Sequence, residues 1–374
     1  MRSFYDSIFF NVPHLRFPEF TEEWETKPIN DLAVVIGGGT PDTTVKSYWD
    51  GKIQWFTPSE IGKTKYVDSS LRTITEDGLN NSSAKRLPPN TILLSSRATI
   101  GECSLSLREC ATNQGFQSLV SKKCNVDFLY YLIQTKKNDL IRKSCGSTFL
   151  EISANEVRKI QVSIPSDVEQ QKIAGLLSLI DERIATQNKI IERLETLIKG
   201  ITQNITLHNK PNVRISECLE CTSSTLQESD ALRSGTYPVY GANGIVGYLD
   251  NYSTQDEAVY IIKDGSGVGT VSYVTGQCST TGTLNTLQAK EGYSLQYLYY
   301  ILKVFNFEPY KTGMAIPHIY FKDYGKAKIF CPSYTKQLQY ARLLSAIDGK
   351  VSTEQNSLAS LSLQKQYLLR QMFI

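Results

Sequence analysis

The chain has 374 residues, of which 41% are hydrophobic and 21% are charged, and its net charge is +3. This length suits two globular domains with connecting elements, and the composition excludes a disordered or collagen-like chain. No stretch approaches the ~20 apolar residues of a membrane span, and the first ten residues carry an acid among aromatics where a signal peptide has an aliphatic core. We therefore expect a cytoplasmic protein without membrane contact, whose eight dispersed cysteines are reduced thiols.

The charge is distributed unevenly but is nowhere extreme. Residues 16–165 carry 19 basic and 17 acidic side chains, and residues 211–333 carry 9 and 11. Neither balance by itself indicates nucleic-acid binding. A DNA-binding surface would have to come from local clusters of Lys and Arg.

Short strands and turns are expected over residues 16–165 and 211–333, which are rich in Gly, Thr, Ser, Tyr and Asn. In chain order, the apolar run Thr91–Leu94 predicts a strand, Asp127–Lys143 a helical segment, Ala258–Ile262 a strand and Leu295–Phe305 a second helical segment. Each of the two regions is therefore predicted to be an α+β domain.

The chain contains an internal repeat. Residues 165–181 align without gaps with residues 332–348 at an offset of 167, and nine of the seventeen positions are identical. Shorter matches precede them: Leu129-Tyr130-Tyr131 matches Leu298-Tyr299-Tyr300, Ile100-Gly101 matches Val268-Gly269, and Gly146 matches Gly313. Each copy is thus expected to run through a variable domain into a long helix.

Apolar residues at alternating spacings of four and three predict a coiled-coil seam on each long helix. Each seam is about 50 Å long at ~1.5 Å per residue, more than one small domain can cover, so we expect the helices to pair with each other. An amphipathic helix lying on its own domain is the alternative. The predicted seam residues are Ile173, Leu177, Ile180, Ile184, Ile191, Leu194 and Ile198 in the first helix, and Leu344, Ile347, Val351, Leu358, Leu361 and Leu368 in the second.

Several motifs resemble the specificity subunit of Type I restriction-modification systems, and the resemblance covers nearly the whole chain. The motifs are Arg16-Phe17-Pro18-Glu19-Phe20 followed by Trp24, Trp55-Phe56-Thr57-Pro58-Ser59-Glu60-Ile61, Glu169-Gln170-Gln171-Lys172-Ile173-Ala174, and Tyr237-Pro238-Val239-Tyr240-Gly241-Ala242-Asn243-Gly244-Ile245. The second helix departs from the pattern, because Thr335-Lys336-Gln337-Leu338-Gln339 stands where Glu-Gln-Gln is usual, but its seam is retained.

The resemblance implies an α+β fold in which two similar target-recognition domains are joined by two long helices that form an antiparallel coiled coil, with an internal pseudo-two-fold repeat. The expected boundaries are 1–165 for the first recognition domain with a short N-terminal segment, 166–210 for the central helix, 211–333 for the second recognition domain and 334–374 for the C-terminal helix.

The resemblance also implies a non-catalytic subunit in phage defence, whose two domains each read one half of a bipartite, asymmetric double-stranded DNA target. The helices would set the spacer and dock two methyltransferase subunits that methylate adenine N6, and restriction subunits would join through the complex. No cofactor is expected on this chain; S-adenosylmethionine, ATP and Mg are expected on the partner subunits.

Two other readings stay open, a stand-alone nuclease or methyltransferase and a protein-binding adaptor. The sequence lacks the Asn-Pro-Pro-aromatic motif of amino-methyltransferases and a phosphate-binding loop. Gly265–Gly269 imitates a cofactor loop, and we interpret it as a DNA-facing or tight-turn loop. Pro41-Asp42 with Asp50-Gly51-Lys52 imitates a nuclease motif, and Gly51 indicates a turn. The Cys218/Cys221 pair imitates a zinc or redox motif, and we interpret it as buried cysteine. No catalytic or metal site is predicted.

DNA contacts are expected on loops, from side chains able to bond to base edges or phosphates. The candidates are Lys46, Ser47, Tyr48, Lys63, Lys65, Ser95, Ser96, Arg97, Ser147 and Thr148 in the first domain, and Tyr240, Asn243, Lys263, Ser266, Lys311 and His318 in the second. An ordinary solvated surface residue is the alternative for each. Trp49, Trp55 and Phe56 are predicted to be core residues.

Overall fold

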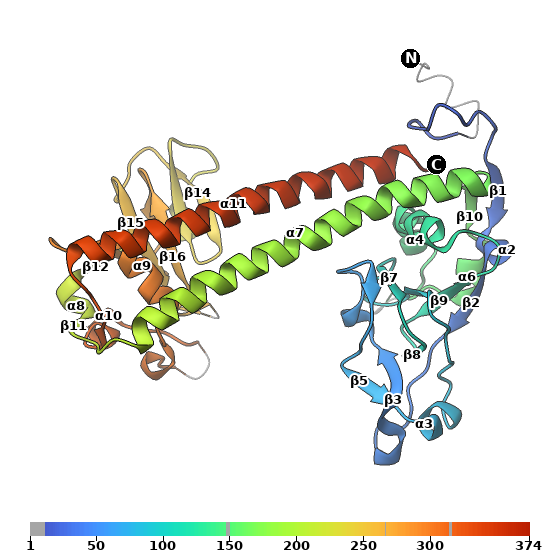
Figure 1. The fold of residues 1–374 in the computed structure, drawn as a ribbon, viewed down its shortest axis with the longest axis horizontal. Coiled ribbons are helices and arrows are strands. Elements are labelled where there is room, and N and C mark those ends of the chain that lie inside the picture. Colours follow the sequence, from blue (N-terminus) through green and yellow to red (C-terminus); the bar gives the residue numbers. More distant parts are fainter. Residues whose placement is uncertain (1–11, 147–149, 266, 314–315) are drawn as a thin grey trace. The chain divides into compact units, whose positions relative to one another are not determined.

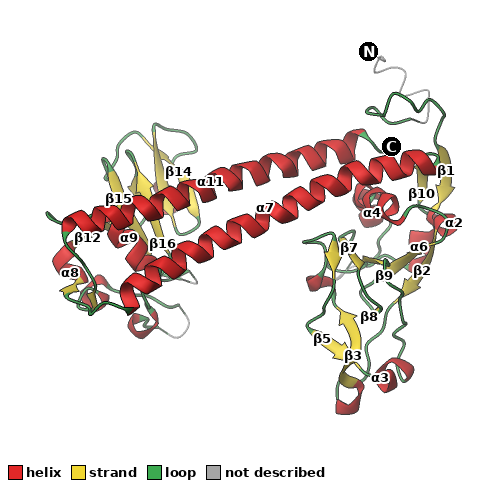
Figure 2. Ribbon diagram, viewed as in Figure 1, coloured by secondary structure: helices red, strands yellow, loops and turns green. Residues whose placement is uncertain are grey.

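The computed structural model describes residues 12–146, 150–265, 267–313 and 316–374. It divides into two compact units, which we call unit 1 (residues 1–188 and 357–374) and unit 2 (residues 189–356). Both long helices contribute to both units, because the first runs through residue 188 and the second through residue 357. Figure 2 shows strands and helices in each unit.

Unit 1 contains three sheets. Strands β1 and β10 form an antiparallel pair, β2-β9-β6-β7-β4 form a five-stranded sheet, and β5-β3-β8 form a three-stranded sheet. The elements are β1 (Glu25–Pro28), α2 (Ile29–Leu32), β2 (Ala33–Gly37), β3 (Trp49–Phe56), β4 (Tyr66–Val67), β5 (Arg72–Ile74), α3 (Glu76–Asn80), β6 (Ile92–Leu94), β7 (Cys103–Ser106), β8 (Cys110–Thr112), β9 (Gln117–Ser121), α4 (Val126–Thr135), α5 (Lys137–Arg142), α6 (Ala154–Lys159) and β10 (Gln161–Ile164).

Unit 2 repeats this arrangement with a four-stranded sheet β12-β18-β15-β16, a three-stranded sheet β14-β13-β17 and the pair β11-β19. The elements are β11 (Val213–Arg214), α8 (Ile215–Cys218), β12 (Leu219–Ser223), β13 (Tyr237–Gly241), β14 (Gly244–Leu249), β15 (Glu257–Ile262), β16 (Val271–Thr275), β17 (Ser279–Thr280), β18 (Leu284–Ala289), α9 (Leu295–Lys303), α10 (Phe321–Tyr324) and β19 (Lys328–Ile329).

The sheet topology confirms the internal repeat. The order β2-β9-β6-β7 corresponds to β12-β18-β15-β16, and one parallel pair recurs in each unit, β3 with β8 and β13 with β17. The four elements predicted in the two domains are also confirmed: the expected strands are β6 and β15, and the expected helical segments are α4 with α5, and α9. Trp49, Trp55 and Phe56 are buried, as predicted.

The two long helices begin directly after the Pro-Ser pairs of the repeat. Helix α7 spans Asp167–Leu207, with 41 residues, and α11 spans Tyr334–Gln371, with 38 residues. Every predicted seam residue is buried or half-buried, whereas most of the residues between them are exposed. The polar residue Gln187 lies in this seam and is buried too.

In unit 1 the end of α11 packs against the beginning of α7, and the two helices run antiparallel (Figure 1). Leu368 and Met372 share a core cluster with Ile173 and Leu177. Further along, Lys365 forms an ion pair with Asp181 at 2.7 Å, and both side chains are mostly buried. Apolar contacts therefore join the two helix ends, and the mostly buried Lys365–Asp181 ion pair fixes the register between the helices.

The segment before β1 fastens both helix ends in unit 1. Arg16 donates two hydrogen bonds to the carboxylate of Glu169, at 2.7 and 2.8 Å, and the Leu15 amide donates to the Gln371 carbonyl at 2.8 Å. Such a two-pronged guanidinium–carboxylate contact is directional as well as charged. Trp24 donates to the same carboxylate at 3.4 Å and packs edge-on against Phe373.

A buried glutamine ties each long helix to its domain in the same way. The side-chain oxygen of Gln170 accepts from the Asn125 amide at 3.0 Å, and its nitrogen donates to the Pro165 carbonyl at 3.0 Å. In unit 2, Gln337 makes the same two bonds with the Ser294 amide and the Pro332 carbonyl, both at 2.9 Å. We call these two residues the glutamine clamps. Asn125 and Ser294 are the N-caps of α4 and α9, so each clamp joins a long helix to the buried helix of its domain.

Two further contacts recur at equivalent positions. Lys122 donates to the Asn30 carbonyl at 2.7 Å, and Lys290 donates to the Ser216 carbonyl at 3.0 Å. The Tyr131 hydroxyl donates to Asp181 at 2.6 Å, and the Tyr300 hydroxyl donates to Asp348 at 3.3 Å. The repeat therefore preserves hydrogen bonds as well as topology. None of the described helices has the length and apolarity needed to cross a bilayer.

We predict that Gln337→Leu lowers the stability of unit 2 by about 2 kcal/mol, because it leaves a buried amide and a buried carbonyl without partners. The measurement is thermal or urea unfolding of the full chain, followed by limited proteolysis. Gln339→Leu, on the exposed side of the same helix, is the matched control. Equal stability of the two variants would contradict the role of the clamp.

Candidate nucleic-acid interface

In unit 1 the structure brings together two loops that carry predicted DNA contacts. One loop connects β6 to β7, and the other connects α5 to α6. The Ile152 amide donates to the Ser96 carbonyl at 3.1 Å, and Cys145 and Glu151 exchange two backbone bonds of 2.9 Å. The guanidinium of Arg97 forms an ion pair with Glu151 at 2.9 Å across the two loops. We call this arrangement the loop pair of unit 1.

Unit 2 has a loop pair with the same backbone bonds. The loop between β15 and β16 meets the loop between α9 and α10: the Ile319 amide donates to the Lys263 carbonyl at 2.9 Å, and Thr312 and His318 exchange two bonds of 2.8 Å. Asp264 faces His318, with 3.9 Å between Oδ1 and Nδ1. All these residues lie 167 positions after their counterparts in unit 1.

The backbone conformation of the loop pairs also repeats. Ala98 has a φ of +54° and Gly265, at the equivalent position, a φ of +94°. A residue with a Cβ atom is strained there, so the loop shape is imposed on Ala98 by its surroundings. Gly313 has a φ of +87°, and a Cβ atom on it would lie 2.4 Å from the Ile316 carbonyl oxygen. The turn in this loop therefore requires glycine.

The loop pairs gather some of the predicted DNA contacts but not all. Arg97, Lys263, Lys311 and His318 belong to them and are half-buried. Lys311 forms an ion pair with Glu308 at 2.6 Å. Ser147, Thr148 and Ser266 lie outside the described residues.

The remaining candidates lie on other loops. Lys46 and Ser47 are exposed in the turn before β3, where Tyr48 is half-buried, and Lys63 is exposed before β4. Asn243 is exposed at the tip of the β13–β14 hairpin. Tyr240 in the same hairpin is half-buried, with its ring 5.8 Å from that of Tyr260.

The structure corrects the expectation for Lys65. Its ammonium group is buried: it forms an ion pair with Asp127 at 2.6 Å and donates to Ser178 at 2.7 Å. It also lies 5.0 Å from the centroids of the Tyr66 and Tyr131 rings. Carboxylate, hydroxyl and aromatic faces replace water around the charge, so Lys65 joins its domain to α7 and does not face DNA.

The structure also corrects Ser95 and Ser96, whose side chains are fully buried at the end of β6. The Ser95 hydroxyl donates to the Arg97 carbonyl at 2.8 Å and accepts from the Thr99 hydroxyl at 3.0 Å. These hydrogen bonds shape the loop from inside. Ser95 therefore supports Arg97, whereas the buried hydroxyl of Ser96 has no hydrogen-bond partner, and neither serine leaves an exposed hydroxyl for a phosphate.

Sequence reasoning missed Glu151 and Asp264, which complete the two loop pairs. Each is a single acid in a loop whose neighbouring residues do not mark it as DNA-facing. The internal repeat could have identified them, because Glu151 and Asp264 are the repeat equivalents of two predicted DNA contacts, His318 and Arg97, at the offset of 167 residues.

The sequence motifs that imitate catalytic sites are structural. Asp42 accepts from the Thr44 amide and hydroxyl at 2.9 and 2.7 Å, and the hydroxyl bond is the main cause that lowers the pKa of Asp42. Cys218 is buried, as predicted, whereas Cys221 is only half-buried. The interaction of Cys218 with Cys331, followed by burial, raises the pKa of its thiol. The loop Gly265–Gly269 leads into β16 and not into a helix. Over the described ranges, no three His, Cys, Asp or Glu side chains gather as metal ligands would.

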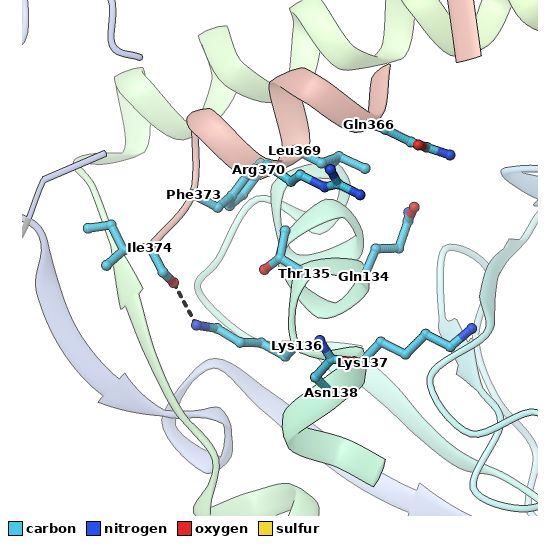
Figure 3. A pocket seen from close by; sticks show the side chains of 10 residues that line it. All are labelled: Gln134, Thr135, Lys136, Lys137, Asn138, Gln366, Leu369, Arg370, Phe373 and Ile374. Carbon is cyan, nitrogen blue, oxygen red and sulfur yellow. Dashed lines mark hydrogen bonds between the residues drawn. The ribbon is translucent and has the colours of Figure 1, made fainter. Parts of the chain in front are cut away.

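Unit 1 has a pocket of about 400 Å³ between the α4–α5 junction and the end of α11 (Figure 3). Three of the side chains that line it are basic: Lys136, Lys137 and Arg370. Lys136 donates to the Ile374 carbonyl at 2.6 Å, and burial lowers the pKa of its ammonium group. None of the residues that line this pocket is a predicted DNA contact.

Comparisons with known proteins agree with this architecture. The family model described as the Type I restriction modification DNA specificity domain matches residues 21–196 and again residues 210–363. The EcoprrI specificity subunit of Escherichia coli, a Type I restriction enzyme subunit, is 25% identical over 93% of this chain and 92% of its own length. The MjaIX specificity subunit of Methanocaldococcus jannaschii is 38% identical, over 49% of this chain and 44% of that protein.

Solved structures show the same fold. The Type I restriction-modification S subunit from M. genitalium has a TM-score of 0.64 and 18% identity, over 97% of this chain and 99% of that one. A chain from a structure of Type I system complex assembly has a TM-score of 0.54 over 96% of this chain. The family domain matches this chain twice and together the two matches cover most of the chain, which therefore belongs to the non-catalytic, DNA-recognising specificity subunits of Type I restriction-modification systems.

Proposed function

We propose that each unit of this subunit reads one half of a bipartite, asymmetric DNA sequence through its own loop pair. The observation that carries the proposal is the repetition of the loop pair: the same backbone bonds present different side chains in unit 1 and unit 2. A repeated loop backbone presents two similar faces to DNA, as a symmetric dimer presents two identical faces to a palindromic site. Different side chains on that frame make the two half-sites different.

The helices have a second role in this proposal. Helices α7 and α11 pair along their seams as an antiparallel coiled coil, hold the spacer between the half-sites and dock two methyltransferase subunits. Restriction subunits join through that complex in the cytoplasm. S-adenosylmethionine, ATP and Mg²⁺ are bound by those partners. The buried seam and the Asp181–Lys365 ion pair support the helix pairing.

We expect a host that carries this chain with its methyltransferase subunit to acquire a new split methylation motif, with one methyladenine in each half. The measurement is methylome sequencing, and a host with the methyltransferase alone is the control. Methylation that does not depend on this chain would instead favour a protein-binding adaptor.

Exchanging residues 211–333 for the corresponding domain of another specificity subunit is expected to change one half of the motif and leave the other unchanged. The reason is that β11 and β19 pair at the two ends of this domain, and Gln337, outside the exchanged segment, bonds to it through a backbone amide, which another domain also provides. Methylome sequencing gives both halves in one experiment. Changes in both halves would contradict independent reading.

We predict that Arg97→Ala weakens binding of the complete bipartite site about 5- to 150-fold, because a contact between arginine and a base edge is worth ~1–3 kcal/mol. Titration of the full complex at moderate salt measures the effect. Arg108→Ala, which removes an exposed arginine paired with Asp68 on another loop, is the control. Titration curves that do not distinguish Arg97→Ala from the wild type would remove Arg97 from the interface.

A further inference from the structure

The two loop pairs carry opposite charges at equivalent positions. Arg97 and Asp264 occupy the same place on the loop after the strand, and Glu151 and His318 occupy the same place on the facing loop. In unit 1 the strand-end loop carries the cation and the facing loop the anion. In unit 2 the strand-end loop carries the anion, and the facing loop carries histidine.

The backbone alone already closes each loop pair. In unit 1 one backbone hydrogen bond of 3.1 Å joins the two loops, and two of 2.9 Å close the turn within the facing loop. In unit 2 two bonds of 2.9 and 3.0 Å join the loops, the second from the Gly265 amide to the Pro317 carbonyl, and two of 2.8 Å close the turn. The side-chain pairs are partly exposed: Arg97 and Glu151 are 42% and 38% exposed, and His318 and Asp264 are 33% and 42% exposed. Exposed ion pairs contribute little to stability. Loop closure therefore does not explain why Arg97 faces Glu151 in unit 1 and Asp264 faces His318 in unit 2.

The ion pair in unit 1 leaves Arg97 able to bind a second acceptor. Glu151 contacts Nη2 at 2.9 Å, and the Nε of Arg97 is buried without a hydrogen-bond partner, so a DNA acceptor would meet the rest of the side chain, which is 42% exposed overall. The guanidinium carries five N–H donors in a fixed plane. A neighbouring carboxylate that holds this plane before DNA arrives reduces the side-chain entropy that binding would cost.

The chemistry of base edges distinguishes the two charges. Arginine donates to the O6 and N7 acceptors of guanine, whereas an aspartate accepts from the N4 amino group of cytosine. A carboxylate facing guanine O6 or N7 would be repelled, so it also rejects the wrong base. An arginine and an aspartate at one position therefore select different bases, guanine and cytosine.

We propose that Arg97 and Asp264 are matched specificity-determining residues, with Arg97 reading a guanine in one half-site and Asp264 a cytosine in the other. Glu151 and His318 are the positioning residues that hold them. This inference rests on the proposed function and adds the base class that each unit reads at this position.

The test exchanges the charges while keeping the ion pair. The variant Arg97→Glu/Glu151→Arg retains a cross-loop pair and reverses its polarity. The full complex is titrated with duplexes that carry each single-base substitution of the methylome-defined motif. We expect the preference for one guanine in the first half to fall about tenfold or more, while base preferences in the second half stay unchanged.

Two further variants separate reading from folding. Asp264→Asn keeps the shape of the side chain and removes its charge, and it is expected to reduce the preference for one cytosine in the second half only. Arg108→Asp/Asp68→Arg exchanges another exposed ion pair of unit 1, with 2.6 Å between Nε and Oδ1. This control is expected to leave every base preference unchanged.

The outcomes are distinct. Unaltered first-half preferences in Arg97→Glu/Glu151→Arg would show that the pair only joins the loops, and would overturn the inference. Loss of preference in both halves would indicate general damage and would overturn it too. A wild-type chain that directs no split motif would overturn the proposed function itself.

Discussion

The architecture depends on one buried side-chain amide at the start of each long helix. The glutamine clamps satisfy both ends of that amide with backbone groups, one from the preceding strand segment and one from the N-cap of α4 or α9. A buried amide with either end unpaired would be costly, so the three elements that meet there are fixed together. The long helix, the buried helix and the sheet edge of each unit take their relative positions from this junction.

Around that shared junction the two units differ in their supports. Glu169 receives Arg16 and the Trp24 ring nitrogen in unit 1, whereas the equivalent residue in unit 2 is the exposed Lys336. Asp181 holds both Tyr131 and Lys365, whereas Asp348 holds Tyr300. In the second helix, Lys336 replaces the glutamate that pairs with the N-terminal segment in unit 1. Gln337, which forms the clamp, is retained.

Sequence patterns predicted most of the fold because apolar periodicity reports burial directly. The seam on α7 and α11, the strands β6 and β15 and the helices α4 and α9 all follow from it. Polar residues were harder to place. Lys65 looks like a surface lysine in sequence, and only its distant partners Asp127 and Ser178 explain why it is buried. Glu151 and Asp264 gain a role from a residue on another loop, which local sequence does not reveal.

Two of the three repeated anchors, the glutamine clamps and the lysine pair, bond to main-chain atoms of a kind that every amino acid provides, apart from the proline amide. Gln170, Gln337, Lys122 and Lys290 reach amides or carbonyls, so the residues that carry those atoms can be replaced without loss of the bond. Such anchors tolerate evolutionary drift in their partners, and they are consistent with an S subunit of only 18% identity that retains this fold. The same property suits genetic recombination, because a domain acquired from another subunit needs only a backbone of the right shape at the junction.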